Sequence, residues 1–122
     1  MKIWTERPTR TDVEAVVRGY FDLLRAGRIP EAEEFIDHSQ VRHVLKSLWR
    51  GSVEADGDPV TADWEQDLSW LGELDLAEFH WGTGSSFYVE ITYRAQVIEV
   101  SLGFRVRPTD AGWVLTGPAT YW

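Results

Sequence analysis

The stretch Gln96–Arg107 constrains the fold of this chain more than any other. Apolar side chains stand at every second position from Ile98 to Val106, and mostly polar or charged ones stand between them. Because successive side chains of a β-strand point to opposite faces, this alternation predicts a strand with one strongly apolar face. Three further runs, separated by turn residues, extend it into an antiparallel meander: Leu74–Trp81, Phe87–Arg94 and Trp113–Tyr121.

The residues at the start of the chain favour helices. Thr11 followed by Glu14 is a capping-box signature, and apolar residues then recur at helical spacing up to Gly27. Pro30 suits the first turn of a short second helix, since its missing N–H is harmless there, and this helix is expected to end near Asp37.

The middle of the chain is less regular. Ser39–Gly51 carries the full apolar stripe of a third helix, which Gly51 is expected to stop. The polar stretch Ser52–Pro59 is expected as a loop or small hairpin, and Thr61–Leu71 as a further short helix.

Together these elements predict an α+β fold in a single domain spanning residues 1–122. N-terminal helices would pack on the apolar face of a curved antiparallel sheet, giving a cone-shaped molecule with an internal pocket. The expected lining of that pocket is aromatic, and the candidates are Trp49, Trp64, Tyr93, Phe104 and Trp113.

The composition narrows the range of functions. The chain has no cysteine, which excludes disulfides, thiolate nucleophiles and cysteine-based metal sites. Its net charge of −8 argues against nucleic acid and suits a basic protein partner, although acidity also serves solubility alone. No segment resembles a signal peptide or a membrane span, so a cytoplasmic protein without membrane contact is expected.

The order of these elements resembles the nuclear transport factor 2-like superfamily, which includes ketosteroid isomerase and the SnoaL-like polyketide cyclases. Besides the element order, which covers nearly the whole chain, six residues carry the resemblance: Tyr20, Phe21, Gly27, Arg28, Gly112 and Trp113. The resemblance implies a cone with an apolar pocket, often dimeric through the outer face of the sheet. The helical pattern of Ser39–Gly51 departs from the many members that turn to extended structure there.

The resemblance also implies a catalytic pair. In members like ketosteroid isomerase, a carboxylate just past the second helix acts as the base, and a tyrosine on the first helix donates a hydrogen bond to the oxyanion. Asp37 and Tyr20 occupy the matching places here, and an apolar pocket would strengthen their interactions. The alternative is that Asp37 caps the following helix together with Ser39, and that Tyr20 belongs to the core.

A second candidate acid–base pair is Glu78 with His80. The two residues share one face of a predicted strand, which Leu74 and Leu76 precede. If this face points inward, a carboxylate and an imidazole enter an apolar pocket. If the face of Phe79 and Trp81 points inward instead, both polar groups face solvent.

No metal site and no cofactor is predicted. His38 and His43 are five residues apart and therefore do not share a helical face, and no cluster of ligands is expected around His80.

Three classes of function remain open. The first is a non-catalytic binding domain for a small apolar molecule or a protein partner. The second is a cofactor-independent isomerase, dehydratase or cyclase that acts on a hydrophobic substrate. The third is an acidic, immunity-type inhibitor of a basic protein, with an exposed patch expected near Glu54–Asp67. The mixed outer face of the sheet is a candidate surface for a homodimer.

Overall fold

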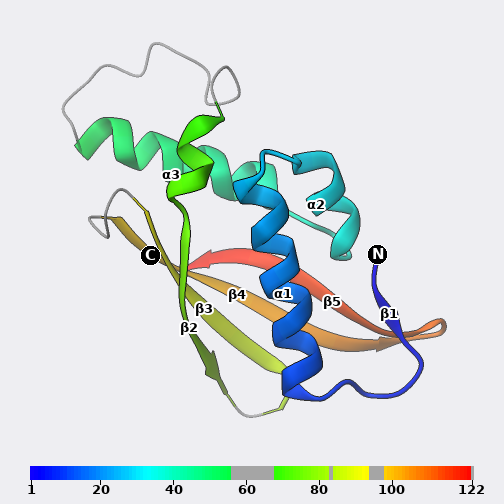
Figure 1. The fold of residues 1–122 in the computed structure, drawn as a ribbon. Coiled ribbons are helices and arrows are strands. Elements are labelled where there is room, and N and C mark those ends of the chain that lie inside the picture. Colours follow the sequence, from blue (N-terminus) through cyan, green and yellow to red (C-terminus); the bar gives the residue numbers. More distant parts are fainter. Residues whose placement is uncertain (56–67, 83, 94–97, 122) are drawn as a thin grey trace.

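The computed structural model describes residues 1–55, 68–82, 84–93 and 98–121 (Figure 1). In chain order the elements are β1 (Ile3–Trp4), α1 (Arg10–Arg25), α2 (Ile29–Phe35), α3 (Val41–Ala55), the 3-10 helix η1 (Ser69–Glu73), β2 (Asp75–Trp81), β3 (Ser86–Tyr93), β4 (Ile98–Thr109) and β5 (Gly112–Tyr121).

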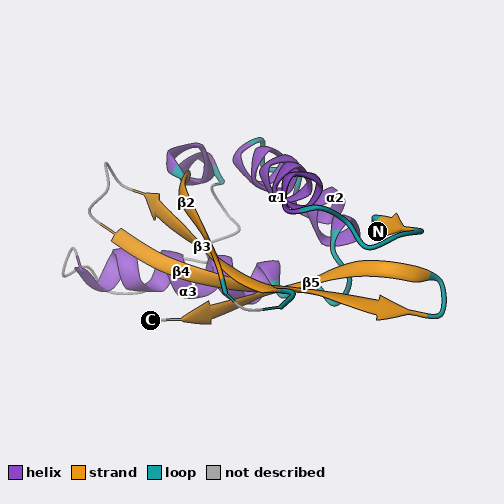
Figure 2. Cartoon of the chain, turned by 90° about the horizontal axis from the view of Figure 1, so that it is seen from below, coloured by secondary structure: helices purple, strands orange, loops and turns teal. Residues whose placement is uncertain are grey.

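The strands form one five-stranded sheet in the order β1-β5-β4-β3-β2, and each pair is antiparallel. Helix α1 crosses one face of this sheet, and the view from below places α1 and α2 on the same side of the strands (Figures 1 and 2). The sheet does not close into a barrel. The predicted α+β class and the four-stranded meander are therefore confirmed, and a short N-terminal strand adds to the β5 edge.

Helix α1 begins two residues earlier than its sequence signature suggested, because its N-cap is Thr9 and not Thr11. Thr9 is the N-cap: its hydroxyl accepts from the Asp12 N–H at 3.1 Å, and the Thr9 N–H donates to the Asp12 carboxylate at 3.2 Å. The prediction that Thr11 and Glu14 form this box is wrong. The two pairs have the same spacing, and spacing alone does not choose between them.

Helix α3 follows the predicted stripe but continues past Gly51 to Ala55. A glycine inside a helix costs only about 1 kcal/mol, which packing of the apolar stripe can offset. The loop predicted for Ser52–Pro59 is therefore helical at its start. Residues 56–67 lie outside the described part of the chain. Most of the helix predicted for Thr61–Leu71 falls there, and the last residues of that range form the start of the 3-10 helix η1. No described helix has the length and apolarity needed to cross a membrane.

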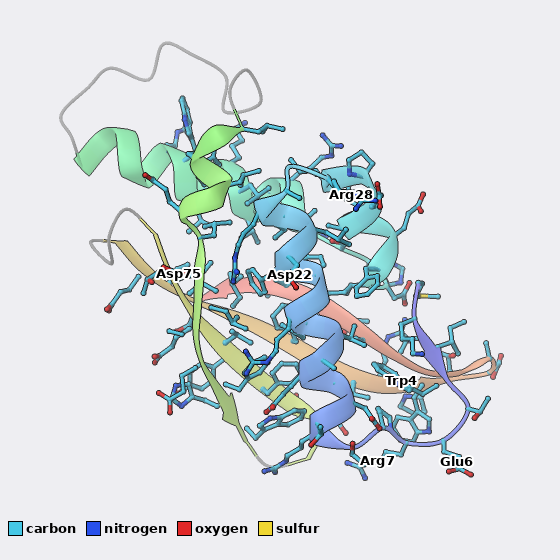
Figure 3. All side chains as sticks on the ribbon, in the orientation of Figure 1. Trp4, Glu6, Arg7, Asp22, Arg28 and Asp75 are labelled. Atoms are coloured by element: carbon cyan, nitrogen blue, oxygen red, sulfur yellow. The ribbon has the colours of Figure 1, made fainter. Side chains whose placement is uncertain are left out.

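One core joins the helices to the sheet, and side chains fill the space between α1 and the strands (Figure 3). The alternating residues of β4 are buried as predicted, with Leu102 only 1% exposed. Helices α1 and α3 contribute their apolar stripes to the same cluster: Val13, Val17, Tyr20, Phe21 and Leu24 from α1, and Val41, Val44, Leu45 and Leu48 from α3.

A β-bulge in β2 decides which face of this strand points to the core. Leu76 lies opposite Ile91, but Glu78 lies opposite the next residue of β3, Glu90, so Ala77 is an extra residue. A bulge of this kind reverses the alternation of side chains. Leu76 and the later pair of Phe79 and Trp81 consequently pack against the core, and Glu78 and His80 lie on the outer face.

A second irregularity bends β5. Arg105 pairs with Thr116 and Gly103 pairs with Ala119, so β5 has one more residue than β4 between these two points. Pro118 is buried and Ala119 is exposed on the outer face. The extra residue shifts the alternation of β5, so Ala119 does not share the face of Leu115.

Candidate functional site

The space between the helices and the sheet is filled. The cavity there has a volume of about 10 Å³, which is at most the size of one water molecule. Its walls come from α1, α3, the sheet and the segment before β2: Tyr20, Phe21, Leu24, Val41, Val44, Leu45, Leu48, Leu74, Ile91, Leu102 and Pro118. Within the described residues, this part of the interior has no room for a ligand.

Tyr20 is a fully buried wall of this small cavity. Its ring lies edge-on to Phe21 and Phe104, with centroids 5.6 and 6.4 Å away, and its hydroxyl lies 3.4 Å from the Ser39 hydroxyl. Burial raises the pKa of Tyr20 above its ordinary value, and the Ser39 contact lowers the pKa only in part. The phenol is thus held neutral among core side chains.

Asp37 attaches the segment after α2 to the sheet. Its N–H donates to the Leu115 carbonyl at 2.9 Å, and its carboxylate accepts from the Arg107 guanidinium at 2.6 Å. The cavity lined by Tyr20 does not include Asp37. The two residues that the resemblance paired therefore have different surroundings. Tyr20 packs in the core, and Asp37 connects the segment after α2 to β4 and β5.

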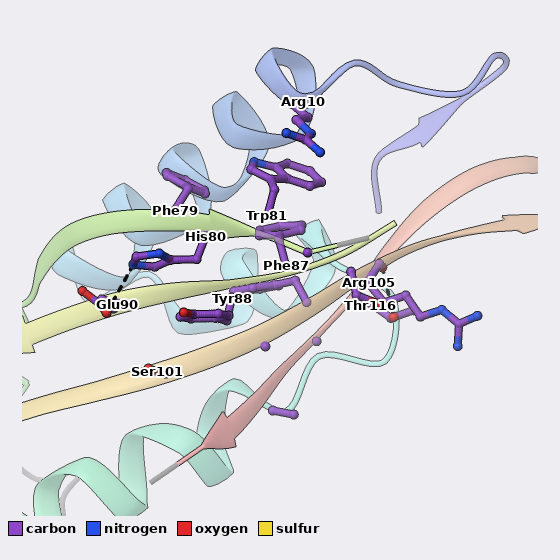
Figure 4. Close-up of a pocket in the computed structure, with 16 residues that line it drawn as sticks. Arg10, Phe79, His80, Trp81, Phe87, Tyr88, Glu90, Ser101, Arg105 and Thr116 are labelled. Atoms are coloured by element: carbon purple, nitrogen blue, oxygen red, sulfur yellow. Dashed lines mark hydrogen bonds and ion pairs between the residues drawn. The ribbon is translucent and has the colours of Figure 1, made fainter. Parts of the chain in front are cut away.

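A much larger hollow, with a volume of about 1140 Å³, runs along the strands and draws its lining from both faces of the sheet (Figure 4). Phe79 and Trp81 lie on the side of α1, whereas His80, Tyr88 and Glu90 lie on the outer face. Gly103 and Ala119 are paired across β4 and β5 beside Tyr88, and their small size leaves this depression open. The remaining lining comes from the surrounding strands and from α1: Arg10, Phe79, His80, Trp81, Gly82, Ser86, Phe87, Glu90, Ser101, Phe104, Arg105, Thr116 and Gly117.

Of the aromatic residues predicted to line a pocket, Phe104 lines this hollow. Trp49 and Trp113 are half-buried and pack against the core instead. Trp64 and the side chain of Tyr93 lie outside the described part of the structure, as does most of the patch expected near Glu54–Asp67.

The outer face of β2 and β3 brings three potential ligands together. His80 Nε2 lies 3.2 Å from a Glu90 carboxylate oxygen and 3.6 Å from a Glu78 carboxylate oxygen. The imidazole stacks on Tyr88, with ring centroids 4.6 Å apart and planes inclined by 14° (Figure 4). The expectation that no ligand cluster surrounds His80 is corrected here: strand pairing supplies Glu90, which lies 10 residues or more from both partners in sequence.

The inner face of β2 contacts a polar stripe of α1. The Trp81 indole N–H donates to Glu14 at 2.9 Å, while the Arg10 guanidinium lies 5.1 Å above the Trp81 ring. Arg18 lies 5.0 Å above the Phe79 ring. The spacing of Arg10, Glu14 and Arg18, four residues each, is the signal that could have identified this stripe as one helical face.

No family model, no curated protein and no solved structure matches this chain.

Proposed function

We propose that this chain is a non-catalytic binding domain that docks a basic protein on the outer face of its sheet. The observation that carries the proposal is the contrast between the filled interior and an open hollow that reaches the outer face of the sheet. The cavity between α1, α3 and the strands encloses about 10 Å³, whereas the hollow that includes the exposed Tyr88 measures about 1140 Å³.

The shape of the hollow favours a protein over a small apolar molecule. Small-molecule sites typically have volumes of about 300–1,000 Å³ and bury most of their ligand. The hollow exceeds that range and lies open at the surface. Tyr88 is 42% exposed at its edge, and exposed tyrosines are frequent anchors in protein interfaces.

The charge of the whole chain, rather than the lining of the hollow, which includes Arg10, Arg105 and Glu90, favours a basic partner. A net charge of −8 on 122 residues attracts cationic proteins over distances of about 10 Å at moderate salt. Such charge raises the association rate and the specificity more than it raises the final affinity.

We also infer membership of the nuclear transport factor 2-like superfamily. The order of elements supports it, because three helices precede a four-stranded antiparallel meander. In this interpretation the usual pocket of the fold is filled, and binding has moved to the outer face.

The proposal is tested by filling the hollow. Ala119→Arg places a long side chain in the depression, and Ala15→Arg makes the same charge change at an exposed site of α1. A protein retained by the immobilised wild-type chain from its native extract is purified and titrated against all three proteins. We expect a basic protein that binds wild type and Ala15→Arg, with at least tenfold weaker binding to Ala119→Arg and weaker binding at higher salt.

Equal binding to all three proteins would place the contact elsewhere and overturn the proposal. A dimer of wild type in light scattering that Ala119→Arg converts to a monomer would also overturn it, because the occupant of the hollow would then be a second copy of the chain.

A further inference from the structure

One edge of the hollow carries a cluster of potential metal ligands, of which His80 and Glu90 also line the hollow. Glu78 and His80 come from β2 and Glu90 from β3, and one ligand atom of each lies within 4.8 Å of the others. We propose that these three side chains bind a divalent transition-metal cation of the Zn²⁺ class. The inference does not depend on a protein partner, since a domain that binds no protein can still hold the ion.

The distances match a shared ion. Bonds of about 2.0–2.2 Å from Zn²⁺ to nitrogen and oxygen put two ligand atoms about 3.4 Å apart at the tetrahedral angle. The two separations from His80 Nε2, 3.2 Å to Glu90 and 3.6 Å to Glu78, lie on either side of that value. Small rotations of the side chains would complete the geometry.

The state of the imidazole nitrogen is an independent observation. His80 Nε2 exposes less than 1 Å² to solvent and has no hydrogen-bond partner in the described structure. Withdrawn from water, this nitrogen faces the carboxylates of Glu90 and Glu78 at 3.2 and 3.6 Å. A cation between the imidazole and the two carboxylates would bind all three groups at once.

The protein also orients this nitrogen in advance. The stack of His80 on Tyr88 restricts the ring, and the pairing of Glu78 with Glu90 across two strands places both carboxylates on the same side of the sheet. A ligand set built on strands needs little reorganisation to bind.

The donor set indicates the class of metal. One imidazole with two carboxylates suits Zn²⁺ and its neighbours in the first transition row, whereas Ca²⁺ and Mg²⁺ prefer sites made of oxygen alone. Three protein ligands leave at least one position for water or for a group from another molecule.

The test is a calorimetric titration of the tag-free chain with ZnCl₂ at pH 7. We expect one Zn²⁺ per chain in wild type, and at least tenfold weaker binding in His80→Gln and in Glu90→Gln. Co²⁺ provides a second readout, because its visible absorption in a site of low coordination number should appear with wild type and be lost in both variants.

Matched controls use the same substitutions elsewhere. His43 and Glu34 are exposed on α3 and α2, so His43→Gln and Glu34→Gln should bind Zn²⁺ within twofold of wild type. Glu78→Gln changes a side chain that is 69% exposed, and it tests the site even if a change at His80 disturbs the fold. Absence of Zn²⁺ binding, or site variants that bind like wild type, or controls that lose binding equally, would each overturn the proposal.

Discussion

At the scale of single residues, Tyr20 illustrates how surroundings determine a role. Its phenol is fully buried, and its hydroxyl makes a long contact with the Ser39 hydroxyl, at 3.4 Å. Its ring packs edge-on against the rings of Phe21 and Phe104, which belong to the core. An oxyanion donor needs a substrate within reach, and the cavity beside this hydroxyl has a volume of about 10 Å³.

The raised pKa of Tyr20 predicts a specific pH dependence of stability. An unfolded tyrosine loses its proton near pH 10, whereas the folded one keeps it, so unfolding releases a proton above that pH. Stability should therefore fall as the pH rises above 10, by up to about 1.4 kcal/mol per pH unit from this residue. Urea denaturation at pH 9 to 11 should show a shallower fall for Tyr20→Phe than for wild type.

Tyr88→Phe is the matched control, because Tyr88 is 42% exposed. Its pH profile should follow wild type, and a Tyr20→Phe profile as steep as that of wild type would contradict the assignment.

At the scale of elements, the start of α1 depends on one of two equivalent signatures. Thr9 with Asp12 and Thr11 with Glu14 have the same spacing, and only Thr9 caps the helix. The Glu14 carboxylate instead accepts a hydrogen bond from the Trp81 indole N–H, at 2.9 Å. Glu14, which the local sequence pattern assigned to the helix cap, therefore contacts β2 instead.

Two threonine variants test this assignment. Thr9→Ala removes the side-chain acceptor of the cap and should lower the free energy of unfolding by about 1 kcal/mol. Thr11 is exposed inside the helix, so Thr11→Ala should change stability by no more than about 0.5 kcal/mol or raise it slightly. Urea denaturation measures the free energy of unfolding of both variants. A larger loss in Thr11→Ala than in Thr9→Ala would contradict the assignment of Thr9 as the N-cap.

At the scale of the whole molecule, the interior of this chain is filled by side chains, whereas a cone-shaped domain that holds a ligand would have an open pocket there. Side chains from α1, α3 and three strands meet there, since Ile91, Leu102 and Pro118 come from β3, β4 and β5. Such an interior contributes to stability, and the proposed binding surface includes the opposite face of the sheet.

A cavity-creating variant tests the filling directly. Leu102→Ala should lower the free energy of unfolding by about 2–5 kcal/mol and open a space large enough for xenon. Wild type should show no xenon-induced shifts of core methyl resonances, and Leu102→Ala should show them near α1 and α3. Glu99→Ala, at an exposed position of the same strand, should behave like wild type. Xenon uptake by wild type would contradict the filled interior.

The sequence by itself determined the fold class, the alternation of β4 and the apolar stripe of α3, because these patterns are periodic and local. It left the faces of β2 and the end of β5 undecided. Those depend on Ala77 and on the extra residue near Gly117, where a strand has one residue more than its neighbour. A bulge exists only in the pairing of two strands, so no single run of residues reveals it.

The candidate site has the same origin. Glu78 and His80 were recognised as a pair from their spacing, but Glu90 joins them only when β3 pairs with β2. The same pairing places them on the outer face, which is one of the two alternatives that their spacing left open. Whether the interior is filled also depends on the summed volume of side chains from distant segments, and for that reason only the tertiary structure could place the open surface on the far side of the sheet.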